Sequence, residues 1–158
     1  MNSFANLANC FERMIRIDYP EYAHKIREEG GGPVIFDPVR KKWVTLTPEE
    51  WVRQNFLQVL LQVQGYPSAL VSVEKEILVG EMRKRYDIVV FGRDTLPFLL
   101  VECKQTTEAM DQSVLDQALR YHIKMPVRYI VITNGHYTYA WKKEEGRLHL
   151  LEALPAFE

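Results

Sequence analysis

The sequence has little of what several common classes of protein require. It has only two cysteines, Cys10 and Cys103, and four scattered histidines without the spacing typical of zinc sites. Because Cys103 ends an apolar run and should point into the core, we expect no structural disulfide and a reducing compartment. No apolar run is long enough to span a bilayer, and Glu12, Arg13 and Arg16 interrupt any secretory apolar segment. We therefore expect a cytoplasmic protein with no membrane partner.

The chain also lacks an excess of positive charge. Its formal net charge is -1, which argues against a protein that coats nucleic acid by bulk electrostatics. Two basic clusters remain, Arg40-Lys41-Lys42 and Arg83-Lys84-Arg85, and each is either a solvated turn or a local phosphate contact. There is no Gly-x-x-x-x-Gly-Lys loop of the kind that binds nucleotide triphosphates. Any contact with nucleic acid must therefore come from local groups.

The length of 158 residues suits one domain with a true core. Residues 1–16 have apolar side chains at helical spacing and a polar opposite face, which predicts an N-terminal helical extension. The globular domain is then expected over residues 17–158. The apolar positions of the extension are Phe4, Leu7, Ala8, Phe11 and Ile15.

Turn residues and hydrophobic period divide the rest of the chain into elements. Residues 28–33 resemble a flexible connection, and Thr47-Pro48-Glu49-Glu50 is a strong helix start in which Glu50 is placed to close a capping box with Thr47. The predicted helices are 48–65 and 107–125; the predicted strands are 34–36, 43–46, 70–78, 87–91, 97–104, 127–133, 137–141 and 148–151. This order predicts an α/β fold with a mixed β-sheet flanked by helices, an αβββαβ core with added β-hairpins.

The run Phe98–Lys104 is the first candidate site. It is apolar until it ends in Glu102-Cys103-Lys104. Because side chains alternate along a strand, Glu102 and Lys104 should share one face while Cys103 faces the core. Charges at the end of a buried strand are costly unless they are paired or bind a metal, so a surface ion pair and a functional site are both open at this point.

The hairpin between Asp87 and Glu102 favours the functional reading. If its turn is centred near Asp94 and Thr95, Asp87 lies opposite Glu102, with Cβ atoms about 4.5 to 5.5 Å apart. Two facing carboxylates repel each other unless a cation lies between them, and oxygen ligands of this kind suit Mg²⁺ or Mn²⁺. The backbone carbonyl of Cys103 is a further candidate ligand. Lys104 could orient or deprotonate a water on the metal, or offset phosphate charge.

Asp87 followed by Glu102-Cys103-Lys104 resembles the PD-(D/E)xK nuclease motif, with Tyr86 in place of the usual proline. More narrowly, the chain over about residues 18 to 155 is similar to small proteins that resemble the N-terminal nuclease domain of type I restriction enzyme R subunits. The residues that carry this resemblance include Ile35-Phe36-Asp37-Pro38, Leu46-Thr47-Pro48-Glu49-Glu50-Trp51-Val52-Arg53-Gln54, Asp87-Ile88-Val89-Val90, Val101-Glu102-Cys103-Lys104, Gln117, Tyr121 and Thr133-Asn134-Gly135. The resemblance implies a restriction-endonuclease-like core.

The resemblance also implies roles for individual residues. Asp87 and Glu102 would bind the metal, and Lys104 would be the catalytic lysine. Gln117 and Tyr121 match a Gln-x-x-x-Tyr motif that contacts DNA near the scissile phosphate in related nucleases. An ordinary amphipathic helix with a partly exposed tyrosine explains the same spacing.

Four further groups are weaker candidates. Glu50 corresponds to a helix carboxylate that supplements the metal site in this superfamily, while the capping box offers a purely structural explanation. Arg53, one turn later, is a candidate phosphate contact, as are Arg83, Lys84 and Arg85. Thr133-Asn134-Gly135 ends a strand near the expected site, and a simple turn also accounts for it.

The sequence therefore predicts a Mg²⁺-dependent endonuclease that hydrolyses DNA phosphodiester bonds. The alternative is a nucleic-acid-binding or regulatory module that keeps the nuclease fold without turnover. Since the chain carries no translocation or target-recognition module, the resemblance points to DNA and to either a homodimer or partner subunits of a larger complex.

Overall fold

The computed structural model describes residues 14–158. The helix predicted over residues 1–16 therefore lies almost wholly outside the described residues. At the start of the described part, Ile15 is buried, and its backbone N–H donates to the Thr138 carbonyl at 2.8 Å. The chain thus enters the core at Ile15. No helix among the described residues is long and apolar enough to cross a membrane.

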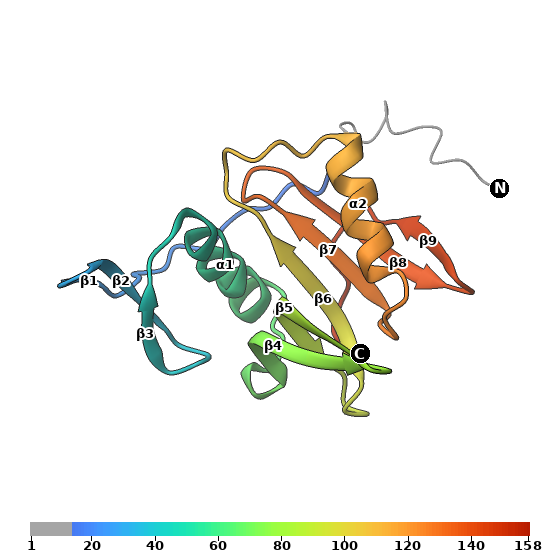
Figure 1. Cartoon of the computed structure of the whole chain (residues 1–158), viewed down its shortest axis with the longest axis horizontal. Helices are drawn as coiled ribbons and strands as arrows, with labels where there is room; N and C mark the ends of the chain where they lie inside the picture. Colours follow the sequence, from blue (N-terminus) through green and yellow to red (C-terminus); the bar gives the residue numbers. More distant parts are fainter. Residues whose placement is uncertain (1–13) are drawn as a thin grey trace.

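A six-stranded sheet and two helices form the body of the protein (Figure 1). The strands lie in the order β4 (Val71–Val79), β5 (Met82–Phe91), β6 (Pro97–Cys103), β7 (Tyr129–Thr133), β8 (Thr138–Glu144) and β9 (Arg147–Leu150). All neighbours are antiparallel except β6 and β7, which are parallel and are joined through helix α2 (Gln112–His122). With α1 (Pro48–Gln58) before β4, this confirms the predicted αβββαβ order in a mixed sheet.

The two helices cover opposite faces of the sheet. Val52, Phe56 and Leu57 of α1 belong to one buried cluster, together with Ile88 and Val101 from the strands. On the other face, α2 packs through Leu115, Ala118 and Leu119 against Val89, Leu100 and Ile130. The long apolar runs of β5, β6 and β7 follow from this arrangement, because strands buried on both faces carry apolar side chains at nearly every position.

Helix α1 begins as the sequence predicts, with one difference. The Thr47 hydroxyl accepts a hydrogen bond from the Glu50 backbone N–H at 3.0 Å, and Pro48 occupies the first turn. The Glu50 side chain does not complete a capping box. It bonds instead to Arg40, Arg53 and Gln54, because these donors reach its buried carboxylate. The helix continues into a π-helical turn over Val59–Val63.

A separate three-stranded sheet lies beside α1 (Figure 1). It contains β1 (Ile26–Glu29), β2 (Gly32–Asp37) and β3 (Lys42–Thr45), all antiparallel. The β2–β3 hairpin confirms the sequence prediction, whereas the flexible connection predicted over residues 28–33 is wrong. That segment is a tight hairpin, and Gly32 adopts a φ of 124°, which a side chain would disfavour.

Two element boundaries also differ from the predictions. Strand β5 begins at Met82 rather than Asp87, because the polar residues before Tyr86 pair with β4. Helix α2 begins at Gln112 rather than near Thr107. Asp111 is its N-cap, and its carboxylate accepts the Val114 backbone N–H at 3.0 Å.

Candidate active site

A cavity of about 520 Å³ lies where β5 and β6 meet α2. Asp87 of β5, Glu102 of β6 and Lys104, just after β6, line this cavity. Gln117 and His122 of α2 also line it. With Arg85, which also lines the cavity, the structure brings together five of the residues that the sequence singles out, and His122, which it does not.

The pairing of β5 with β6 places Asp87 beside Glu102. The β5–β6 ladder ends at the pair Ile88 and Val101, and Asp87 and Glu102 are the residues that follow directly at this end. The Asp87 carboxylate is held by the backbone that follows Glu102: its Oδ2 accepts a hydrogen bond from the Cys103 backbone N–H at 2.8 Å. Tyr86 packs on the α2 side of the sheet and Ile88 on the α1 side, so the usual alternation breaks at Asp87.

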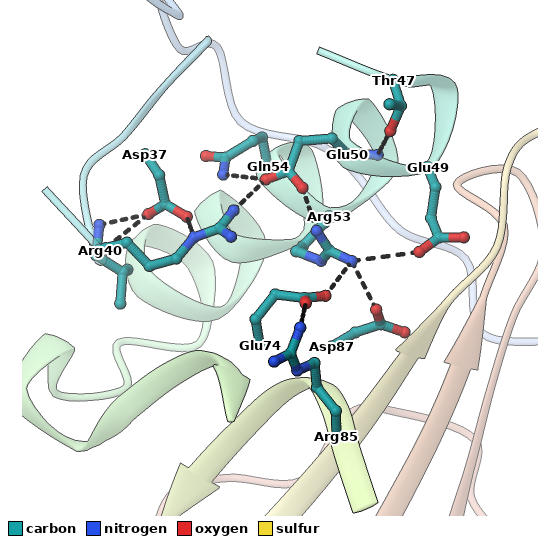
Figure 2. A network of polar contacts seen from close by, with 11 residues as sticks. Asp37, Arg40, Thr47, Glu49, Glu50, Arg53, Gln54, Glu74, Arg85 and Asp87 are labelled. Atoms are coloured by element: carbon teal, nitrogen blue, oxygen red, sulfur yellow. Dashed lines mark hydrogen bonds and ion pairs between the residues drawn. The ribbon is translucent and has the colours of Figure 1, made fainter. Parts of the chain in front are cut away.

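Arg53 holds the other oxygen of Asp87 (Figure 2). Its Nη2 lies 2.7 Å from Asp87 Oδ1, 2.8 Å from Glu74 Oε1 and 3.2 Å from Glu49 Oε1, while Nη1 donates to Glu50. Burial alone would lower the pKa of the Arg53 guanidinium, but its hydrogen bond to Asp87 and the charges of Asp87 and Glu50 outweigh burial and raise the pKa. Arg53 is therefore a buried cation that forms ion pairs with four carboxylates.

Glu50 lies in the middle of a chain of buried charges that leads away from the cavity. Its carboxylate accepts hydrogen bonds from Arg40 Nη2 at 2.5 Å and Gln54 Nε2 at 2.9 Å, in addition to Arg53. Arg40 in turn donates to Asp37 Oδ2 at 2.5 Å. Figure 2 shows this path from Asp37 to Asp87. Glu50 does not line the cavity, and its oxygens already have three partners.

Glu102 is held from the α2 side. Its Oε2 lies 2.7 Å from His122 Nε2, and its Oε1 lies 3.5 Å from Lys104 Nζ. Burial raises the pKa of the Glu102 carboxyl, but the hydrogen bond and charge of His122 and the charge of Lys104 outweigh burial and lower the pKa. Glu102 is thus kept ionised, as a metal-binding carboxylate must be.

Lys104 lies between two carboxylates. Its Nζ is 3.5 Å from Glu102 Oε1 and 3.4 Å from Glu108 Oε1. Partial burial lowers the pKa of Lys104, but the charges of Glu102 and Glu108 outweigh it, and the pKa is raised. Lys104 is therefore held as an ammonium ion.

The family model of the type I restriction enzyme R protein N terminus (HSDR_N) matches residues 48–155, which include α1, all six strands of the main sheet and α2. The chain belongs to this family. No curated protein sequence matches it.

Two solved structures are similar to this R-protein N-terminal family member. The first is a fragment assigned to the HsdR subunit of a type I restriction enzyme from Vibrio vulnificus YJ016, with 21% sequence identity and a TM-score of 0.50. The match covers 70% of this chain but only 24% of the Vibrio chain. The second is a protein from Anabaena variabilis ATCC 29413 assigned as a DUF820 nuclease, with 10% identity, a TM-score of 0.46 and coverage of 80% and 79% of the two chains. The Vibrio match supports a shared restriction-endonuclease-like fold.

The remaining candidates of this family member lie in different settings. Gln117 lines the cavity, and Tyr121 follows one turn later on α2 with its side chain outside the described part of the structure. Arg83 and Arg85 are exposed on β5, and Arg85 reaches the cavity. Arg53 is buried and bound to carboxylates, so a contact with phosphate would require its guanidinium to leave these partners, and that role stays a prediction.

His122 and Glu74 are site residues that sequence reasoning missed. His122 is separated from Glu102 by 20 positions and lies on another element, so no local pattern joins them. One signal was present: His122 follows Ala118 by four residues, on the face of α2 that also carries Val114, and all three line the cavity. Glu74 gave no such signal, because its position depends on a backbone φ of 55° inside β4.

Proposed function

We propose that this protein is a metal-dependent nuclease that hydrolyses DNA phosphodiester bonds. The observation that carries the proposal is the convergence of Asp87, Glu102 and Lys104 on one open cavity in a member of the R-protein N-terminal family. The same cavity contains Gln117, which offers amide groups to a substrate. Asp87 and Glu102 act as the metal-binding carboxylates, with the Cys103 carbonyl as a further candidate ligand.

The charge around Asp87 supports a divalent cation. Five carboxylates surround only three guanidinium groups in the network of Figure 2, which leaves an excess of negative charge. Burial and the neighbouring charge of Asp87 raise the pKa of the Glu49 carboxyl, as expected where carboxylates crowd together. The carboxylates are those of Asp37, Glu49, Glu50, Glu74 and Asp87; the cations are Arg40, Arg53 and Arg85.

The available oxygen ligands fit a hard divalent cation that needs only one or two carboxylates from the protein. Among residues 14–158, no group of three or more His, Cys, Asp or Glu side chains is arranged to hold a metal ion, so the ligand set is two carboxylates with backbone and solvent. This composition suits Mg²⁺ or Mn²⁺, which retain several waters. When bound, such an ion polarises a phosphoryl oxygen and makes a water molecule more acidic.

The side chains around the cavity have separable tasks. Glu102 stays ionised because its pKa is lowered, and Asp87 is oriented by the Cys103 N–H. The raised pKa of Lys104 favours a charged role over proton abstraction. Lys104 therefore orients the attacking water and offsets negative charge on the phosphate in the transition state.

One observation favours a second candidate, a nucleic-acid-binding module without turnover. Both candidate metal ligands already have cationic or donor partners, Arg53 for Asp87 and His122 with Lys104 for Glu102. Each candidate ligand therefore has a positively charged partner even without a metal. The two functions differ in whether divalent cations change what the protein does to DNA.

Cleavage assays separate the two functions. Single-stranded, duplex and branched DNA, and RNA, are incubated with Mg²⁺ or Mn²⁺, with and without chelator. We expect chelator-sensitive cleavage of DNA, with Asp87→Asn and Lys104→Gln each reducing the rate about 100-fold or more. Glu152→Gln, at an exposed position remote from the cavity, serves as the matched carboxylate control. Cleavage that survives chelation or Asp87→Asn contradicts the site; binding without cleavage of any substrate supports the non-catalytic module.

A further inference from the structure

The buried imidazole of His122 is bonded to the carboxylate of Glu102. The side chain of His122 is only 4% exposed, and its Nε2 is 2.7 Å from Glu102 Oε2. That distance is in the range of a strong hydrogen bond to a charged group. Its ring also packs against Tyr86, with ring centroids 5.4 Å apart. The imidazole is therefore fixed from two sides while it holds the carboxylate.

Helix α2 places this imidazole in the cavity by its own geometry. Val114, Ala118 and His122 are four residues apart and share a face, and all three line the cavity. Leu115 and Leu119, on the adjacent face, anchor the helix in the core of that side of the sheet. Because α2 is docked by these apolar contacts, His122 meets Glu102 with little remaining freedom.

The two carboxylates are thus held by different helices. Arg53 of α1 bonds to Asp87 Oδ1, and His122 of α2 bonds to Glu102 Oε2. With Oε2 bonded to His122, the other oxygen of Glu102, Oε1, lies 3.5 Å from Lys104 Nζ. A carboxylate fixed through one oxygen presents its remaining lone pairs in a defined direction.

We infer that His122 is a positioning residue that fixes Glu102 for binding a divalent cation. This inference rests on the proposed function. Partners of metal-binding carboxylates typically account for about 10- to 100-fold in metal affinity, so loss of the His122 hydrogen bond should weaken binding within that range. The effect should appear in the protein alone, before any DNA is added.

Three variants isolate the hydrogen bond from the packing of α2. His122→Leu keeps side-chain bulk and removes the donor, His122→Gln restores an N–H donor, and Leu115→Ala damages the same core without touching Glu102. Binding of Mn²⁺ is measured by titration calorimetry at one fixed pH, and folding by circular dichroism. We expect His122→Leu to weaken Mn²⁺ binding about 10- to 100-fold, His122→Gln to recover part of the loss, and Leu115→Ala to lower stability with affinity retained.

The outcomes distinguish the two claims. Wild-type affinity in a folded His122→Leu protein overturns the positioning role while leaving the proposed function intact. Equal weakening by Leu115→Ala also overturns it, because the effect would then report helix packing. If the wild-type protein binds no Mn²⁺, or if Asp87→Asn binds it as tightly, the proposed function fails and the inference fails with it.

Discussion

At the scale of the residue, Arg53 shows how burial changes the meaning of a charge. A guanidinium that is 5% exposed and bonded to Asp87, Glu74, Glu49 and Glu50 is a structural counterion rather than a surface group for phosphate. Sequence position alone could not reveal this, because the contacts with Asp87 and Glu74 cross between elements. Removing one member of such a network leaves buried charges without compensation.

Arg53→Gln should therefore be costly. We expect it to lower the free energy of unfolding by about 3 to 5 kcal/mol, the usual cost of removing one partner from a buried ion pair. Arg83→Gln is the matched control, because Arg83 is 75% exposed and its ion pair with Glu76 is 3.6 Å long. Urea unfolding of both variants in chelator measures the difference. Equal stability of the two variants would show that the carboxylates around Arg53 are solvated or protonated.

Glu102 gives the protein a dependence on pH at the acid end. Since its folded-state pKa is lowered from 4.5, its ionisation stabilises the fold above that value, and the stabilisation is lost as the pH falls through the lowered folded pKa. We expect Glu102→Gln to be less stable than wild type at pH 7 and the gap to narrow as the pH falls below 4.5 and through the lowered folded-state pKa. Urea unfolding from pH 7 to pH 3 in chelator tests this. A gap that is independent of pH would assign the loss to packing.

At the scale of the element, the sequence predicted most of the fold. The αβββαβ order, the β2–β3 hairpin and the shared face of Glu102 and Lys104 follow from hydrophobic period and turn residues, which act locally. The predicted turn near Asp94 and Thr95 agrees with the observed register of Ile88 with Val101, the pair that precedes Asp87 and Glu102. Strand β1 was missed because Gly30-Gly31-Gly32 is typical of both a linker and a tight hairpin, and only pairing with β2 decides between them.

The turn after β7 contains the motif Thr133-Asn134-Gly135. Thr133-Asn134-Gly135 is stabilised by its own side chains: Thr133 Oγ1 accepts the Gly135 N–H at 3.1 Å, and Asn134 Oδ1 accepts the His136 and Tyr137 N–H groups. Gly135 adopts a φ of 91°, and a Cβ there would lie 3.4 Å from Thr106 Cγ2. A turn therefore accounts for this motif, as the structural alternative predicts.

Gly135→Ala should strain this turn. We expect a loss of about 1 to 3 kcal/mol in unfolding free energy, from the positive φ and the close contact with Thr106. Gly31→Ala is the control, because a Cβ at Gly31 would meet nothing within 4 Å. Thermal or urea unfolding compares the two variants. A neutral effect of Gly135→Ala would mean that the turn can relax to another backbone conformation.

At the scale of the whole molecule, the proposed metal should be linked to stability. A ligand that binds only the folded state at 100 times its dissociation constant stabilises a protein by about 2.7 kcal/mol. We expect Mn²⁺ to stabilise the wild-type protein by this amount and to leave Asp87→Asn unaffected, with Glu152→Gln behaving as wild type. Unfolding curves at increasing Mn²⁺ concentration measure the linkage. Stabilisation of Asp87→Asn equal to that of wild type would place the ion elsewhere.

The path of ion pairs runs from Asp37 through Arg40, Glu50 and Arg53 to Asp87. It shows that the folded unit extends further toward the N-terminus than the region of homology. Homology to the R-protein N-terminal family begins at residue 48, within α1. The part of the chain that contributes to the core begins earlier, because Arg40 in the β2–β3 turn neutralises Glu50, and Ile35 is fully buried. A chain cut at the homology boundary would retain every cavity residue and still leave a buried carboxylate short of a counterion. The small sheet is therefore part of the buried ion-pair network that ends at Asp87, and any transfer of the cavity residues to another protein would have to include Asp37 and Arg40 as well.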